Sequence, residues 1–207
     1  MAIHYRNGCR DLLVRAFTAY GQPLAGATMV EFGNQRLKFD PGEGARRLQS
    51  AKPYFEFLGI RHISIDLNGM SGALPMDLGK RISAPDVPHC CADFVTNFGT
   101  SEHVRTGQRW VFENAHNFAR PGGFFVHAVP KTRTCRRHGH WKYSTEWFES
   151  LAKTNGYRIV ELGDFDKSVA WEDGRIAPGS QVYVLAIMQR MNAEPFQTER
   201  WTDPMRK

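Results

Sequence analysis

The chain has 207 residues, of which 42% are hydrophobic and 23% are charged, and this balance is typical of a water-soluble globular protein. No apolar run approaches the roughly 20 residues that a membrane-spanning helix needs, and the N-terminal segment lacks the apolar core of a signal peptide. We therefore expect a cytoplasmic protein that does not act in a membrane. The four cysteines include an adjacent pair and do not resemble a secreted disulfide framework, so reduced thiols are expected. The formal net charge of +6 is compatible with binding of nucleic acid, with binding of an acidic substrate, or with an ordinary solvated basic surface.

The domain organisation predicted from the sequence is simple. The chain has neither an internal repeat nor an obvious linker, and its length fits one α/β domain better than two. Residues 1–207 are therefore interpreted as one domain, in which residues 1–26 supply an N-terminal helix and residues 190–207 form a tail of unassigned structure. The tail aromatics Phe196 and Trp201 can pack internally or against a second chain, which leaves the oligomeric state open.

Short apolar runs alternate with amphipathic stretches in the first half of the chain. In chain order they predict a helix over 12–20, a strand over 27–33, a helix over 45–57, a strand over 62–66 and an edge strand over 73–78. Asn7 is the expected N-cap of the first helix, and Gly21 is expected to end it. Pro53 should make the second helix short or broken.

The second half continues the alternation and closes with two strands. The expected elements are a strand over 92–99, a helix within 104–118, a turn over 121–123, a strand over 124–129, a helix from Ser144 to Gly156, and strands over 157–162 and 181–188. The last two strands are expected to pair as a hairpin across the loop at residues 172–175. This order predicts a mostly parallel central sheet with helices on both faces and a C-terminal antiparallel hairpin.

Acidic residues and a glycine follow the ends of the predicted strands. Glu31 and Gly33 end the first strand, Asp66 ends the second, and Asp77 follows the third. In open α/β sheets, ligands bind beyond the carboxyl ends of the strands, where a carboxylate can accept ribose hydroxyls. Each residue also has an ordinary structural interpretation as a turn glycine or a capping acid. Asn34 and Gln35 replace the later glycines of the dinucleotide fingerprint.

Two further stretches carry a family resemblance. The sequence Asp93-Phe94-Val95 opens the predicted fourth strand, Glu102-His103-Val104 follows it, and Arg120-Pro121-Gly122-Gly123 leads into the fifth strand. The order and separation of these pieces resemble class I, Rossmann-like S-adenosylmethionine-dependent methyltransferases. The resemblance covers roughly residues 27–163.

The resemblance implies S-adenosylmethionine as the cofactor. By that resemblance, Gly33 and Asn34 would lie against the methionine part, Glu31 would anchor their turn or bind through water, and Asp66 would hold the ribose hydroxyls. The remaining implied contacts are Leu67, Asp77 and Leu78 around the adenine, and Asn97 and Phe98 at the floor near the transferred methyl group. The missing second and third glycines of the first motif are a departure from the family pattern.

The acceptor side is predicted from histidines and a basic cluster after the fourth and fifth strands. His103, His138 and His140 are candidate general bases, whereas His127, inside a predicted strand, is either a base or a histidine of the core. The cluster contains Lys131, Arg133, Arg136, Arg137 and Lys142. Arg133 and Arg136 would bind a phosphate or carboxylate, and Trp141 and Tyr143 would stack on a planar acceptor; a solvated loop is the alternative.

Two metal hypotheses arise from the same region. Glu102-His103 is similar to part of the metal-binding Glu-x-x-Glu-His step of ubiquinone-type O-methyltransferases, but Gly99 stands at the first Glu position, so we expect no metal there. Cys135, His138 and His140 form a Cys-x-x-His-x-His pattern that can bind zinc. The other candidate ligands, at residues 89–91, should lie at the opposite edge of the sheet, so the two groups are not expected to meet.

The function expected from the sequence is methyl transfer to an oxygen or nitrogen atom of a small acceptor that carries phosphate or carboxylate. The alternative is a catalytically inactive cofactor- or nucleic-acid-binding module of the same fold, since the glycine motif is eroded and the net charge is positive. Nucleic acid is not favoured, because the chain has no recognised RNA-binding signature. A nicotinamide-dependent dehydrogenase is a third hypothesis, but the chain lacks its three-glycine fingerprint.

Overall fold

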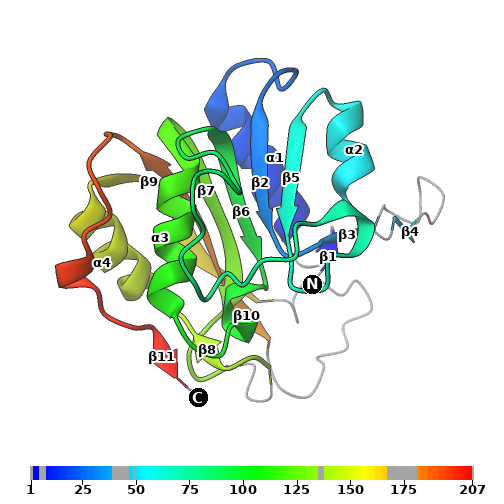
Figure 1. Cartoon of the computed structure of the whole chain (residues 1–207). Helices are drawn as coiled ribbons and strands as arrows, with labels where there is room; N and C mark the ends of the chain where they lie inside the picture. The colour runs from blue at the N-terminus through cyan, green and yellow to red at the C-terminus, as the bar shows by residue number, and fades with distance from the viewer. Residues whose placement is uncertain are drawn as a thin grey trace.

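A mixed six-stranded sheet forms the centre of the molecule (Figure 1). The computed structural model describes residues 2–4, 8–38, 47–48, 50–134, 138–166 and 181–206. The strands of the sheet are, in spatial order, β5 (Arg61–Ile65), β2 (Thr28–Phe32), β6 (Ala92–Phe98), β7 (Ala119–Pro130), β10 (Val182–Arg190) and β9 (Tyr157–Asp166). The first four are mutually parallel, and β10 is antiparallel to both of its neighbours. The predicted fold class is therefore confirmed.

Helices cover both faces of the sheet, as Figure 1 shows with α3 in front of it and α1 behind it. The helices are α1 (Cys9–Tyr20), α2 (Lys52–Phe57), α3 (Gln108–Phe118) and α4 (Thr145–Asn155), with short 3-10 turns η3 (Met70–Gly72), η4 (Ser101–His103) and η5 (Thr198–Arg200). Within the described ranges, no helix is both long and apolar enough to traverse a bilayer.

Alternation of side chains along the strands divides the core between the two faces. Phe94 and Phe98 of β6 pack in the cluster that includes residues of α1 and α2, whereas Val95 between them packs with residues of α3 and α4. This period-two pattern is what a strand buried on both faces requires. The helices on both faces are therefore held by side chains of the same strand.

Two smaller sheets were not predicted. β1 (Ala2–His4) pairs in parallel with β3 (Arg36–Lys38), and β3 pairs with β4 (Arg47–Leu48). The second sheet pairs β8 (Trp141–Lys142) with β11 (Met205–Arg206). Such two- and three-residue strands carry no readable periodicity, because alternation needs at least four residues to be recognised.

Most of the predicted elements and their ends are confirmed. Gly21 and Gly156 follow α1 and α4 in the left-handed conformation, and the Ser144 side chain caps α4 by accepting from the Trp147 amide. β9 and β10 form the expected hairpin. Residues 172–175 lie outside the described residues.

Three local predictions are wrong. The helix expected over 45–57 starts only at Lys52, since β4 occupies 47–48 and proline favours the first helical turn. The edge strand expected over 73–78 is a single bridge between Leu74 and Ile65. The position before α1 is held by Gly8 with φ 70° rather than by Asn7, which lies outside the described residues.

The C-terminal tail packs internally. Trp201 lies 5.8 Å from Phe112 and 5.7 Å from Trp147 between ring centroids, and Phe196 is buried. The guanidinium of the buried Arg190 donates to the carbonyls of His116 and Ala119, which ties the start of the tail to the end of α3. These contacts place the tail on the α3 and α4 face of the sheet.

Asp93 joins three elements at the amino end of β6. Its carboxylate accepts from the Thr28 amide at 2.7 Å, from the Tyr20 hydroxyl at 2.9 Å and from Arg120 Nε at 2.7 Å. The hydrogen bond between Asp93 and Arg120 raises the pKa of Arg120. One nearly buried carboxylate therefore satisfies donors from α1, β2 and β7.

We predict that Asp93→Ala lowers the free energy of unfolding by about 2–4 kcal/mol, because it leaves three partly buried donors without their common acceptor. Urea denaturation checks this. The exposed Asp86, whose carboxylate accepts from the Ser83 hydroxyl in a local turn, provides a matched control, and Asp86→Ala should cost less than about 1 kcal/mol. Equal losses in the two variants would contradict the anchoring role.

Candidate functional site

A cavity of about 500 Å³ opens at the carboxyl ends of β5, β2 and β6. Four loops surround it, and each follows a strand or the bridge at the sheet edge. Its lining residues are Gly33, Asn34, Gln35, Ile65, Asp66, Leu67, Met76, Asp77, Leu78, Gly99, Thr100, His103, Val104, Arg105 and Thr106. The volume is within the range of small-molecule sites, and the position is where open α/β sheets bind ligands.

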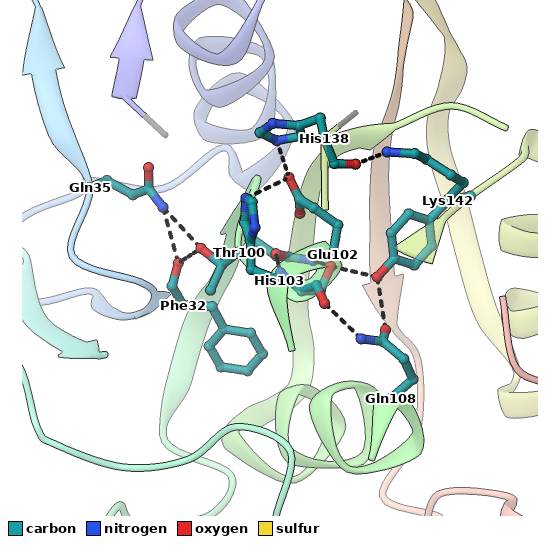
Figure 2. A network of polar contacts seen from close by, with 11 residues as sticks. Phe32, Gln35, Thr100, Glu102, His103, Gln108, His138 and Lys142 are labelled. Atoms are coloured by element: carbon teal, nitrogen blue, oxygen red, sulfur yellow. Dashed lines mark hydrogen bonds and ion pairs between the residues drawn. The ribbon is translucent and has the colours of Figure 1, made fainter. Parts of the chain in front are cut away.

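The turn after β2 is tied to the loop after β6. The Thr100 hydroxyl donates to the carbonyl of Phe32 at 2.7 Å and accepts from Gln35 Nε2 at 3.1 Å (Figure 2). Gly33 has φ 82°, and a Cβ there would lie 2.4 Å from Thr100 Oγ1, so the two loops approach too closely for a side chain. Gln35 thus replaces a later glycine of the fingerprint with a hydrogen bond that closes the turn.

Glu31 lies behind this turn and does not line the cavity. Its Oε2 accepts from the Gln35 amide at 3.1 Å and lies 3.5 Å from Nε2 of the buried His62. Burial raises the pKa of Glu31. Of the two sequence-based roles for Glu31, the structure shows the anchoring contact to the turn.

Asp66 faces the cavity with a partly used carboxylate. Its Oδ2 accepts from the Asn34 amide at 2.9 Å, and its Oδ1 accepts from the Asn68 amide at 3.1 Å. A carboxylate offers about four acceptor positions, so both oxygens can still accept from a hydroxyl. The contact with Asn34 also holds the β2 turn against the end of β5.

Asp77 faces the same cavity from the segment that follows the edge bridge. Its Oδ1 accepts from the Gly79 amide at 2.9 Å. The buried Leu78 and the 71% exposed Leu67 line the cavity as apolar surfaces near the two acids. The structure therefore brings together Gly33, Asn34, Asp66, Leu67, Asp77 and Leu78.

Asn97 and Phe98 do not line the cavity, contrary to the sequence-based interpretation. Both are fully buried, because they precede the point where β6 ends. Phe98 packs in the core on the α1 side. Asn97 accepts from the Ser101 amide at 3.1 Å and donates to the Ser101 hydroxyl at 2.9 Å. It therefore fixes the conformation of the loop after β6 and does not form part of the cavity wall.

A buried polar network holds the η4 turn in place. The Tyr143 hydroxyl lies 2.8 Å from both Ser101 Oγ and Gln108 Oε1, and Gln108 Nε2 donates to the Ser101 carbonyl at 2.6 Å (Figure 2). Burial raises the pKa of the Tyr143 hydroxyl. Satisfied buried networks of this kind rigidify the segment that they hold, and here that segment carries Glu102 and His103.

The stacking role predicted for Trp141 and Tyr143 is wrong. Tyr143 is fully buried and Trp141 is 6% exposed, so neither presents a ring face to an acceptor. Trp141 Nε1 donates to the Val104 carbonyl at 2.6 Å. Hydrogen bonding of the polar tips explains the burial of both rings, and the pair anchors the loop after β7 to the η4 turn.

Glu102, His103 and His138 form a cluster beside the cavity. Glu102 Oε1 lies 3.1 Å from His138 Nε2 and 3.8 Å from His103 Nε2 (Figure 2). His103 also lines the cavity, and burial lowers its pKa. The amide of His140 donates to the Glu102 carbonyl at 2.6 Å, while its side chain is exposed. Two of the three candidate bases, His103 and His138, therefore meet at Glu102, and the backbone of the third, His140, bonds to the same residue.

The loop after β7 approaches this cluster through a glycine. Gly139 has φ 66°, and a Cβ there would lie 2.6 Å from Glu102 Cγ and 2.9 Å from the Glu102 carbonyl oxygen. Any side chain at this position would push the two loops apart. Lys142 donates to the His138 carbonyl. The close approach of Gly139 to Glu102 could not be read from spacing, because the two residues belong to different loops.

The basic cluster is less free than its sequence suggests. Lys131 pairs with Asp164, and Lys142 is 5% exposed. Arg133, with φ 64°, lines a second cavity of about 600 Å³ together with Lys131 and Lys142. Arg136 and Arg137 lie outside the described residues.

His127 is a core histidine. It is 2% exposed, and its Nδ1 accepts from Asn97 Nδ2 at 3.2 Å among the rings of Phe112 and Phe148. Burial lowers its pKa to about 3. Of the two sequence-based interpretations of His127, a base or a histidine of the core, the geometry therefore supports the second.

The candidate zinc ligands at residues 89–91 do not meet the described histidines of the loop after β7. The amides of Cys90 and Cys91 donate to the carbonyls of Asn117 and Phe118 at the end of α3, whereas His138 contacts Glu102. Cys135 lies outside the described residues. Among the described residues, Cys90 and Cys91 thus contact the end of α3, and His138 contacts Glu102 after β6.

Three residues of the cavity wall, Thr100, Gln35 and Arg105, were not predicted from the sequence. Thr100 and Arg105 follow a predicted strand, so the rule that loops at carboxyl ends line the site could have found them. Gln35 gave no such signal, because its role depends on the side-chain hydrogen bond to Thr100.

Comparison with known proteins supports the fold. No protein-family model matches this sequence, and no curated protein is detectably similar to it. Solved structures do match. A 1,6-didemethyltoxoflavin-N1-methyltransferase from Burkholderia thailandensis, bound to 1,6-didemethyltoxoflavin and S-adenosylhomocysteine, superposes with a TM-score of 0.61 at 13% identity over 88% of this chain and 78% of that chain.

Two further structures agree. The N-methyltransferase NodS from Bradyrhizobium japonicum, in complex with S-adenosylhomocysteine, matches with a TM-score of 0.55 at 16% identity, covering 89% of this chain and 88% of that chain. A 16S rRNA (adenine(1408)-N(1))-methyltransferase from Catenulisporales acidiphilia matches with a TM-score of 0.51 at 11% identity, covering 87% and 92%. The chain has the class I methyltransferase fold.

The depressed pKa of His127 predicts a pH dependence of stability. The native imidazole stays neutral down to about pH 3, whereas the unfolded one takes up a proton near pH 6.5. Its contribution is therefore complete above about pH 6.5 and is lost as the pH falls toward 3, by up to about 1.4 kcal/mol per pH unit. His127→Gln should flatten the slope of unfolding free energy between pH 6 and 4 by roughly that amount. An unchanged slope in urea titrations would contradict the assignment.

Proposed function

We propose that this protein is an S-adenosylmethionine-dependent methyltransferase. The observation that carries the proposal is the cavity beyond β5, β2 and β6, with Asp66 and Asp77 facing it from two neighbouring loops. The compared structures share the fold, and two of them are complexes with S-adenosylhomocysteine. The fold, the position of the cavity and its two acids together support the same cofactor here.

The residues of the cavity fit that cofactor. Asp66 retains acceptor positions for ribose hydroxyls, and Asp77 can accept from an adenine amino group. Leu67 and Leu78 would cover the faces of the adenine. Gly33 and Asn34 would lie along the methionine part, in a turn that Glu31 and Gln35 hold in shape.

When bound, the cofactor supplies an electrophilic methyl group on a sulfonium, and the protein supplies alignment. His103 lines the cavity and its imidazole meets that of His138 at Glu102, so a neutral imidazole there could take the proton of an acceptor. His140, from the same loop as His138, is the third candidate base. The lowered pKa of His103 keeps its ring neutral near physiological pH. We propose an oxygen or nitrogen atom of a small molecule as the acceptor.

Fewer basic side chains are available to bind an acidic acceptor than the sequence indicates. Lys131 and Lys142 already have polar partners, which leaves Arg133 as the exposed cation that the second cavity offers among the described residues. A phosphate or carboxylate at Arg133 remains our proposal for the acceptor. An RNA substrate is less favoured, because the sequence has no recognised RNA-binding signature.

Calorimetry with S-adenosylmethionine tests the proposal. Wild type should bind, and Asp66→Ala and Asp77→Ala should each weaken binding by about 1–3 kcal/mol, since each leaves polar groups of the cofactor without an acceptor. Asp86→Ala is the control, because Asp86 lies outside the cavity and should leave affinity unchanged. Folded wild type that binds no cofactor, or Asp66 and Asp77 variants that bind like wild type, would overturn the proposal.

A further inference from the structure

Glu102, His103 and His138 stand apart from the other polar groups near the cavity, because the cofactor contacts proposed above do not use them. They come from two loops, the η4 turn after β6 and the loop after β7. Their ligand-type atoms all lie within 4.8 Å of one another. Around a zinc-sized ion bonded at about 2.0–2.2 Å, neighbouring ligand atoms lie about 3.0–3.5 Å apart, so small side-chain rotations would close the group around one ion.

The buried carboxylate is a second, independent observation. Glu102 is fully buried, and its Oε2 has no hydrogen-bond partner among the described residues. An unpartnered buried carboxylate oxygen is costly. A cation bound through both carboxylate oxygens of Glu102 would satisfy this oxygen, which the two imidazoles at Oε1 do not contact.

The surrounding structure holds the cluster in place. The network of Ser101, Gln108 and Tyr143 fixes the η4 turn from below. Gly139 lets the second loop lie directly on Glu102, and the His140 amide bonds to the Glu102 carbonyl. Supporting contacts of this kind orient metal ligands in proteins.

We propose that Glu102, His103 and His138 bind one divalent first-row transition metal at the mouth of the cavity. One carboxylate and two imidazoles suit zinc or iron better than magnesium, which prefers oxygen ligands. Three protein ligands leave coordination positions open. Because His103 also lines the cavity, an acceptor oxygen or nitrogen would occupy an open position next to the cofactor.

This assignment revises the sequence-based expectation of no metal. That expectation rested on Gly99, which supplies no carboxylate, and the structure supplies His138 from another loop instead. It also makes His103 and His138 ligands rather than bases, which leaves His140 as the remaining candidate base. The role in acceptor binding rests on the proposed methyltransferase function, whereas the metal site itself does not.

The test is calorimetric titration of Zn²⁺ into chelator-treated protein in the absence of cofactor. Wild type should bind one ion per chain, and Glu102→Gln and His138→Ala should each weaken binding by roughly a hundredfold or more, because each removes a direct ligand. His140→Ala is the matched control from the same loop and should retain the wild-type affinity. Thermal unfolding confirms that each variant is folded.

Each outcome bears on the proposal. Absence of Zn²⁺ binding to wild type, equal affinity in all variants, or a loss in His140→Ala as large as in His138→Ala would overturn the ligand assignment. Mg²⁺ binding as tight as Zn²⁺ binding would overturn the metal class. Binding of S-adenosylmethionine to Glu102→Gln, measured separately, should equal that of wild type, so failure of the cofactor proposal and failure of the metal proposal give different results.

Discussion

The parallel pairing of β2 with β5 and β6 is the constraint on which the site depends. Parallel strands end at the same edge of a sheet, so the loops that follow them must meet there. The contacts of Thr100 with Phe32 and Gln35 then join two of these loops, and Asp66 joins the third through the Asn34 amide. A cavity with two acids in its wall is the direct consequence of this arrangement.

A second constraint acts beneath the η4 turn. The side chains of Asn97, Gln108 and Tyr143 all bond to Ser101, which has no freedom to move without breaking buried hydrogen bonds. The next two residues are Glu102 and His103. The chemistry at the mouth of the cavity therefore rests on buried residues that do not touch it, and Tyr143 is better understood as a support than as a contact for an acceptor.

Much of the sheet could be predicted from the sequence, because strands buried on both faces, such as 92–98, appear as continuous apolar runs. Asp66 could be placed because it follows a predicted strand that is present. Asp77 lies at the cavity as expected, although the strand predicted before it is a single bridge. The short strands β1, β3 and β4 could not be predicted, since two or three residues are too few to show a readable alternation. Likewise the meeting of Glu102 with His138 spans 36 residues and depends on the close approach at Gly139.

The central claim is that the cavity beyond β5, β2 and β6 holds the cofactor. A crystal structure of the protein with S-adenosylhomocysteine tests it most directly. The account predicts that the nucleoside lies between Asp66 and Asp77, with the ribose hydroxyls on Asp66 and the sulfur toward His103. A nucleoside bound elsewhere, or a folded protein whose cavity stays empty at saturating S-adenosylhomocysteine, would contradict it.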